Sequence, residues 1–240
     1  MTLDSAAGRA AAQIALWFDT VFGELTVLSS RISSTLIATK GTRARFVEAD
    51  LRPVKPITSE FLARHDFVEA AGVILAPGTI DDNRGTIEWW RPNEAGTNGK
   101  VVFNLTPETG SFYDFENLSW FNNAVRTRTR AITGPYVDYG GLDQYIMTLT
   151  VPLELGANVI GMVGCDIEVR DIETIIVPIL RRIPGDAALI NADQRVILGN
   201  SGRFLVGNRV RETPARGTII RVEAHALGLG LVYAEHADYS

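Results

Sequence analysis

The chain has 240 residues, 46% of them hydrophobic, which is enough apolar material for a folded core in one large domain or two unequal ones. Its formal net charge of -5 argues against nucleic acid as the main partner, because a duplex-binding protein needs a basic face. The single cysteine, Cys165, excludes an internal disulfide and lies in an apolar run, which indicates a small buried side chain.

The N-terminus lacks a basic segment followed by an apolar one, so no signal peptide is expected. No stretch approaches the roughly 20 apolar residues that a membrane-spanning helix needs. We therefore expect a soluble, cytoplasmic protein if the chain is complete, and an extracytoplasmic domain if it is a fragment of a receptor.

Residues 5–38 predict one long helix, because apolar side chains recur there at the spacing of a helix face. The stripe consists of Ile14, Phe18, Val21, Leu25, Leu28 and Ile32. It can pack against a sheet within the chain or pair with its copy in a second subunit, and the sequence favours neither arrangement.

The next segment predicts short elements after a linker. Pro53 and Pro56 indicate the linker, since proline lacks the amide proton that helices and central strands use. The elements expected beyond it are a short helix at 59–65, strands at 71–76, 86–91 and 100–104, and a helix at 114–125. Trp89 and Trp90 are neighbours in one of these strands, so they face opposite sides of it and one of them belongs to the core.

The remainder of the chain predicts a long hairpin followed by a smaller β unit. Gly134-Pro135 indicates a turn, and two strands at 145–155 and 158–169 follow. A helix over 171–182 should be kinked by Pro178. Four short strands are expected after it, at 187–190, 195–198, 218–222 and 229–234.

Three arginines, Arg126, Arg128 and Arg130, alternate with threonines. If this segment is extended, all three lie on one face of it. They predict either a solvated strand edge or a contact with an anion or a partner.

Aromatic rings and carboxylates are interleaved between residues 113 and 166. Asp166 follows an apolar strand, where an unpaired carboxylate would cost several kcal/mol, so it needs a cation, a donor or water. Tyr136 and Asp138 lie two apart and share a face if the segment is extended. Trp120 offers a flat face on which a cation can stack. Rings with a buried acid indicate a site for a small cation, although a core role for the rings and a structural hydrogen bond for the acid remain alternatives.

The order of these segments resembles the double Cache (PDC-like) sensor domains of bacterial receptors. The resemblance rests on the long first helix, on Trp120-Phe121 and Gly134-Pro135-Tyr136, and on the run that ends at Asp166. It implies an α+β fold with a PAS-like antiparallel Cache sheet flanked by helices and a smaller second Cache-like β unit. The domains it implies are a long helix over 1–45, a ligand-binding unit over 46–170, and a linking helix with the small β unit over 171–240.

Cache members that bind amino acids share a pocket motif, and the resemblance carries most of it onto this chain. The matching residues are Tyr113, Trp120, Phe121, Tyr136 and Asp166. Phe121 stands where the family has a tyrosine. Leu118 stands where the family has an arginine that grips the ligand carboxylate, which leucine cannot do.

The missing arginine leads us to expect a small cationic amine or quaternary ammonium ligand, held by an aromatic pocket with a carboxylate anchor. The ligand-binding residues predicted are Tyr113, Trp120, Phe121, Tyr136, Asp138 and Asp166. The alternatives are an amino-acid or carboxylate sensor, with one of the three arginines supplying the charge, and a scaffold protein with a vestigial pocket. The resemblance also extends to stand-alone Cache proteins, which implies a regulator protein as partner.

An enzyme is not expected. Proton transfer by Asp138 and Asp166 is the only chemistry suggested, and no nucleophile with a base supports it. The histidines, His65, His225 and His236, lack the spacing of a metal site, so neither a metal nor a cofactor is predicted. The sequence therefore predicts a sensor that signals through a partner, with a homodimer through the first helix as a further hypothesis.

Overall fold

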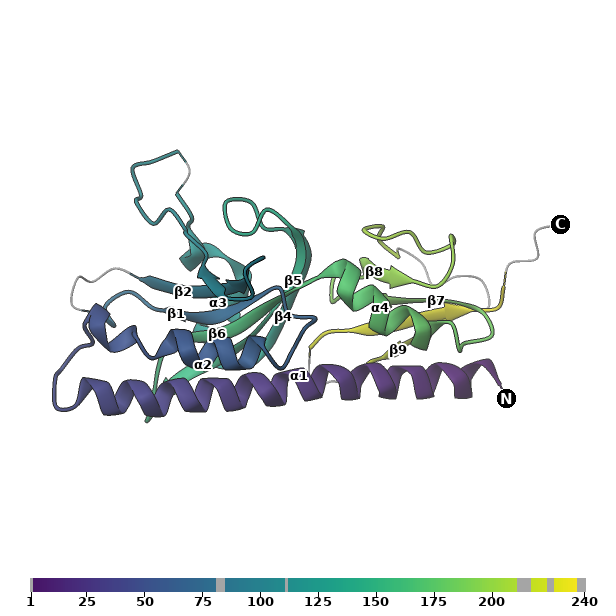
Figure 1. Cartoon of the computed structure of the whole chain (residues 1–240). Coiled ribbons are helices and arrows are strands. Elements are labelled where there is room, and N and C mark those ends of the chain that lie inside the picture. Colours follow the sequence, from purple (N-terminus) through teal and green to yellow (C-terminus); the bar gives the residue numbers. More distant parts are fainter. Residues whose placement is uncertain (1, 81–84, 111, 211–216, 224–226, 237–240) are drawn as a thin grey trace. The chain divides into compact units, whose positions relative to one another are not determined.

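The computed structural model describes residues 2–80, 85–110, 112–210, 217–223 and 227–236, and the chain divides into two units (Figure 1). The larger unit is Phe22–Val169. The smaller unit combines Met1–Val21 with Arg170–Ser240. The α+β class expected from the sequence is confirmed, with a six-stranded sheet in the larger unit and a four-stranded sheet in the smaller one.

The first helix, α1 (Leu3–Lys40), supplies residues to both units. All six members of its apolar stripe are buried, with at most 3% of their surface exposed. The stripe therefore packs within the chain and is not available to a second subunit. Contrary to the expectation from the sequence, α1 could cross a membrane by its length and composition, and 44% of its most apolar stretch is buried inside the protein.

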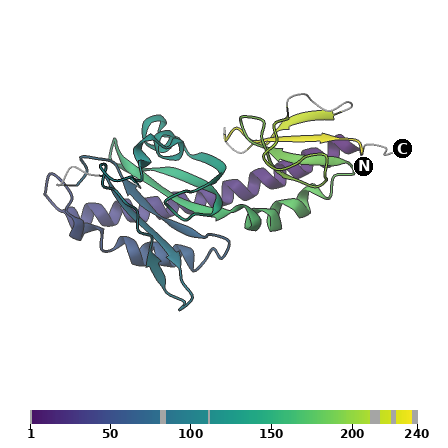
Figure 2. The same ribbon diagram turned by 90° about the horizontal axis from the view of Figure 1, so that it is seen from above.

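The sheet of the larger unit is antiparallel throughout, in the order β3-β2-β1-β6-β5-β4. Its strands are β1 (Ala70–Leu75), β2 (Thr86–Pro92), β3 (Asn98–Lys100), β4 (Ala131–Val137), β5 (Tyr145–Leu155) and β6 (Asn158–Glu168). The central strands are buried on both faces, because helices cover one face and the other is covered by α3 (Ser119–Thr127) and irregular segments. The C-terminal half of α1 and α2 (Val54–Leu62) lie together on one side of this sheet (Figures 1 and 2).

Two expectations from proline are wrong. The predicted linker at Pro53 and Pro56 is the start of α2, preceded by a short 3-10 helix, η1 (Glu48–Leu51). The first turn of a helix tolerates proline, since its amide protons have no partner within the helix. The predicted turn at Gly134-Pro135 lies inside β4, at an irregularity in its pairing with β5.

Two further elements are shorter than predicted. The third strand of the sheet ends at Lys100, so residues 101–104 are irregular. The helix expected over 114–125 is divided at Leu118, whose extended backbone separates a 3-10 helix, η2 (Phe115–Asn117), from α3.

The smaller unit contains α4 (Val169–Leu180) and a sheet in the order β8-β7-β10-β9. Pro178 lies in α4, which ends two residues beyond it. The strands are β7 (Asp186–Ile190), β8 (Val196–Gly199), β9 (Gly217–Arg221) and β10 (Gly230–Ala234).

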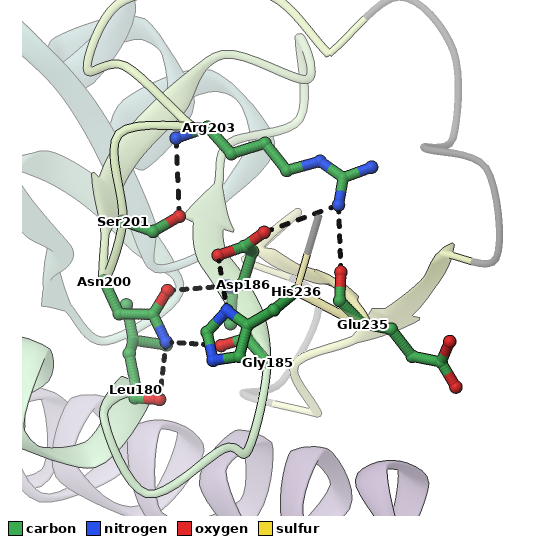
Figure 3. A network of polar contacts seen from close by, with 9 residues as sticks. Leu180, Gly185, Asp186, Asn200, Ser201, Arg203, Glu235 and His236 are labelled. Carbon is green, nitrogen blue, oxygen red and sulfur yellow. Dashed lines mark hydrogen bonds and ion pairs between the residues drawn. The ribbon is translucent and has the colours of Figure 1, made fainter. Parts of the chain in front are cut away.

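A polar network joins the ends of several elements in the smaller unit (Figure 3). The amide of Asn200 donates to the carbonyl oxygens of Leu180 and Gly185, and its oxygen accepts from the Ala187 amide at 2.7 Å. Beside it, the buried carboxylate of Asp186 contacts Arg203 at 3.4 Å and His236 at 3.0 Å. Burial raises the pKa of Asp186, but its hydrogen bonds outweigh that effect and hold the pKa below its usual value.

Candidate functional site

The larger unit contains a cavity lined mainly by aromatic side chains, which we call the aromatic cavity. Its lining residues are Ile74, Trp89, Phe103, Tyr113, Trp120, Tyr136, Asp138, Thr148, Met162 and Asp166. The space open to the centre of a water molecule inside it is about 10 Å³. The cavity therefore accommodates about one water molecule in this structure.

Sheet register explains why distant residues meet here. Thr148 on β5 pairs directly with Asp166 on β6, so their side chains share one face of the sheet. Residues alternate between faces along a strand, which places Met162 on the same face as Asp166. Ile74 pairs with Met162 and joins them from β1. The cavity is built on this face, and α3 supplies Trp120 from above it.

Asp166 is the central polar group, with 5% of its surface exposed. Its Oδ2 accepts a hydrogen bond from the indole nitrogen of Trp89 at 2.8 Å, and its Oδ1 accepts one from the Thr148 hydroxyl at 2.7 Å. Burial raises the pKa of Asp166 to about 7, although the two hydrogen bonds act to lower it. The carboxyl group therefore changes charge near neutral pH, and its ionised form would be stabilised by a cation in the cavity.

A relay of hydroxyl groups extends from Asp166. Because Thr148 donates its proton to the carboxylate, the Tyr136 hydroxyl must be the donor in its 2.6 Å contact with Thr148. Burial raises the pKa of Tyr136 further above its usual value, and the carboxylate of Asp166 adds to the effect. Tyr136 therefore remains a neutral donor.

Asp138 forms the second carboxylate of the lining and is also buried. It accepts from the Tyr113 hydroxyl and from the Leu142 amide, both at 2.8 Å. Burial and the neighbouring Asp138 raise the pKa of Tyr113 far above its usual range. Both oxygens of Asp138 thus have protein partners, so this residue holds its loop in place as well as lining the cavity.

Trp120 presents a hydrogen-bond donor without a protein acceptor. Its indole nitrogen is buried and makes no hydrogen bond among the residues that the structure describes. A buried donor of this kind costs free energy unless water or a ligand accepts from it. It is therefore a candidate contact for an oxygen atom of a ligand.

The structure brings five of the six predicted site residues to the aromatic cavity, all but Phe121. Phe121 lies in the adjoining core, with its ring edge-on to Phe115 at 5.0 Å between centroids. Leu118, at the position of the family's arginine, packs against the same core. Among the residues that the structure describes, no arginine or lysine lines the cavity.

The arginines do not form the extended stripe that the sequence suggested. Arg126 lies in the last turn of α3, and Arg128 follows it with a left-handed backbone. Arg130 stacks on the ring of Phe22, with 4.7 Å from its guanidinium carbon to the ring centroid.

Five lining residues were missed as site residues: Ile74, Trp89, Phe103, Thr148 and Met162. Sheet alternation back from Asp166 identifies Met162, but Ile74 and Thr148 also require the pairing of separate strands. Trp89 and Trp90 do face opposite sides of β2, and only the structure selects Trp89.

The described part of the chain contains no group of three or more His, Cys, Asp or Glu side chains placed to hold a metal ion. His65 and His236 lie in different units, and His225 is outside the described residues. Cys165 is buried, and burial raises its pKa well above the usual value, so its thiol is not reactive.

Several solved structures that share this fold are ligand-binding or sensory domains of bacterial receptors. The ligand-binding domain of the Campylobacter jejuni chemoreceptor Tlp3, in complex with L-valine, matches with a TM-score of 0.67 at 14% identity over 98% of this chain and 91% of that one. The ligand-binding domain of the amino acid chemoreceptor PctC of Pseudomonas aeruginosa, in complex with GABA, matches with a TM-score of 0.61 at 15% identity over 94% of this chain and 95% of that one. The ligand-binding domain of the chemoreceptor CtaA of Pseudomonas fluorescens, in complex with L-valine, matches with a TM-score of 0.61 at 14% identity over 98% of this chain and 96% of that one.

These likenesses show the shared fold, and a family model identifies the family. The model for the methyl-accepting chemotaxis protein-like first PDC sensor domain matches residues 54–174, half of the chain. This segment contains every residue that lines the aromatic cavity. The match supports the double Cache resemblance and a sensory rather than an enzymatic role. The chain belongs to the family of methyl-accepting chemotaxis protein-like PDC sensor domains.

Proposed function

We propose that the larger unit senses a small amino acid, whose protonated amino group is held by Asp166 in the aromatic cavity. The observation that carries this proposal is a buried carboxylate among aromatic rings, with a pKa raised to about 7 by its burial. An ammonium group would offset the cost of burying that charge. The rings of Trp120 and Tyr136 would add cation–π attraction.

The amino-acid class is supported by the relatives. Tlp3 and CtaA are described in complex with L-valine, and PctC with GABA. In this chain the ligand carboxylate would accept from the indole nitrogen of Trp120, because that donor has no partner in the described part of the chain.

An amine without a carboxylate is the second candidate. The observation that favours it is the absence of arginine and lysine from the described lining of the cavity. A carboxylate buried beside Asp138 and Asp166 without a cationic partner would be repelled by both.

Paired ligands separate the two candidates. We would measure thermal stability with L-valine against isobutylamine and with GABA against propylamine, since each pair differs only by the carboxylate. A ligand at 100 times its dissociation constant adds about 2.7 kcal/mol to the free energy of unfolding. Stabilisation by the amino acids alone supports the first candidate. Stabilisation by the amines, or by choline as a quaternary ammonium compound, supports the second.

Asp166→Asn is the matched control variant. Asparagine keeps the size of the side chain and can still accept from Trp89, but it removes the negative charge. We expect the variant to fold and to lose the response to every cationic ligand. Wild-type stabilisation of Asp166→Asn would contradict the proposed anchor.

We infer that the domain is extracytoplasmic. This inference rests on the fold shared with chemoreceptor sensory domains and with the extracellular domain of a putative histidine kinase. The expected cytoplasmic location has no support among these relatives.

The homodimer remains a hypothesis, but the buried apolar stripe of α1 cannot be its interface. Leu25 is fully buried, so Leu25→Asp would test folding rather than assembly. The exposed face of α1 instead presents Leu16, Val27 and Ile37, each at least half exposed. Val27→Glu should convert a dimer to a monomer in light scattering while the chain still folds, and an unchanged mass would remove this face from consideration.

A further inference from the structure

The aromatic cavity is too small for the ligand that it is proposed to bind. Its space of about 10 Å³ accommodates one water molecule, whereas small-molecule sites in proteins enclose roughly 300–1,000 Å³. At least one lining side chain must therefore move when a ligand enters.

Most of the lining side chains are held in place. Seven lie on strands or on α3, namely Ile74, Trp89, Trp120, Tyr136, Thr148, Met162 and Asp166. Two others, Tyr113 and Asp138, are joined to each other by a hydrogen bond of 2.8 Å. The remaining one is Phe103, an apolar side chain on the irregular segment after β3.

Phe103 is only partly buried, with its ring centroid 4.8 Å from that of Tyr113. Backbone hydrogen bonds flank it, from the Val101 amide to the Trp89 carbonyl and from the Tyr113 amide to the Asn104 carbonyl, both at 2.8 Å. These bonds fix the segment on either side of the ring. The ring itself can therefore turn without breaking the backbone attachment.

An open groove lies on the other side of Phe103. It offers about 470 Å³ by the same measure of space, and Phe103 is the residue common to its lining and that of the aromatic cavity. Val101, Val102 and Leu105 make its apolar wall, and the ion pair of Glu88 with Lys100 lies among its polar residues.

We propose that Phe103 is the gate of the aromatic cavity and determines the size of ligand that it admits. Turning the ring outward joins the cavity to the groove, so the amino group reaches Asp166 while a longer or bulkier part of the ligand extends into the groove. This proposal rests on the proposed function, because it concerns entry to the same site. It makes Phe103 a specificity-determining residue that no motif in the sequence identifies.

Acrylamide quenching of tryptophan fluorescence tests the gate without any ligand. In a Trp17→Phe, Trp90→Phe background the remaining tryptophans, Trp89 and Trp120, both line the cavity. Adding Phe103→Ala should raise the quenching constant severalfold, and Phe103→Leu should give an intermediate value. Val102→Ala, at a neighbouring side chain that is 86% exposed, should leave quenching unchanged.

Phe61→Leu is the control for a general loosening of the fold, because it truncates a fully buried ring on α2. The gate is overturned if Phe103→Ala keeps the quenching of its background, or if Phe61→Leu raises quenching as much. Should Phe103→Ala not fold, Phe103→Leu alone decides by the same criterion. If none of the tested ligands raised the thermal stability, the proposed function would be contradicted. The quenching result does not depend on any ligand, so the two failures are distinguishable.

Discussion

Trp89 on β2 reaches Asp166 on β6 across the strand between them, with 2.8 Å from the indole nitrogen to Oδ2. Gly72 on β1 pairs with Trp89 on one side and with Gly164 on the other. A Cβ at Gly164 would lie 3.3 Å from the indole ring, and one at Gly72 would lie 1.9 Å from the Glu88 carbonyl oxygen. Gly164 therefore leaves room for the ring where it crosses the sheet, and Gly72 lets the backbone of β2 approach β1 closely.

Trp89→Phe should destabilise the folded protein, because it removes one of the two hydrogen bonds that the Asp166 carboxylate accepts. The change keeps an aromatic ring but removes a hydrogen bond to a buried carboxylate, a loss of about 1–3 kcal/mol in the free energy of unfolding. It should also raise the pKa of Asp166 further, because this hydrogen bond lowers it. Urea denaturation at pH 8 measures the first effect, and the pH dependence of stability measures the second.

Trp90→Phe is the matched control for this prediction. The neighbouring indole nitrogen is buried without a hydrogen-bond partner in the described structure, and Lys55 lies 4.9 Å from the ring centroid. Phenylalanine loses the same ring volume here as in Trp89→Phe but removes an unsatisfied donor, so this variant should be less destabilised than Trp89→Phe by about 1–3 kcal/mol. Equal losses in the two variants would mean that ring size, not the hydrogen bond, sets the effect.

The titration of Asp166 should make the stability of the ligand-free protein and the affinity for a cationic ligand depend on pH in opposite directions. The pKa of Asp166 in the folded protein, about 7, lies above its ordinary value of 3.8, so folding favours the protonated carboxyl. The contribution of this group to stability is therefore largest at acidic pH and is lost as pH rises from about 4 to about 7. Binding of an ammonium group needs the ionised form, so affinity should fall about tenfold for each pH unit below 7.

The reference for this measurement is Asp166→Asn, which cannot titrate. The difference in unfolding free energy between wild type and variant, taken from pH 4 to pH 8, isolates the carboxyl group from all others. A difference that does not vary with pH over that range would refute the raised pKa.

Tyr113→Phe should loosen the loop that Asp138 anchors. The variant leaves one oxygen of a buried carboxylate without its donor, which costs about 1–3 kcal/mol. Hydrogen exchange should quicken at the Leu142 amide, which donates to the other oxygen. Tyr139→Phe removes a hydroxyl from a residue that is 80% exposed and serves as the control. Comparable exchange in the two variants would show that Tyr113 does not support the loop.

Asn200→Ala should destabilise the smaller unit, because one side chain there makes three hydrogen bonds to backbone groups (Figure 3). Leaving these groups unpaired should lower the free energy of unfolding by roughly 1–3 kcal/mol. Asn208→Ala, on an exposed side chain of the same unit, should change it little. The prediction fails if thermal denaturation cannot distinguish the two variants.

Sequence patterns located most of the elements in segments where one hydrophobic period, that of a helix or that of a strand, dominates. The long helix and the hairpin of β5 and β6 follow from helical spacing and from long β-rich apolar runs with a glycine turn. Proline misled the prediction twice, at the start of α2 and inside β4, because its effect depends on whether the missing amide had a partner to lose. Leu118 gave no local signal of the break that separates η2 from α3.

The sequence by itself determined the fold class, the family resemblance and the buried acid, since each is written in local spacing and residue type. It also predicted one site for Tyr113, Trp120, Tyr136 and Asp166 through the family motif, and for Asp138 through its spacing from Tyr136. Only the tertiary structure decided that Trp89 and Thr148 hold Asp166, that Phe121 belongs to the core, and that Phe103 lines the cavity. These contacts join residues on different strands or on an irregular segment, and strand order and register are properties of the folded sheet that spacing along one strand does not contain.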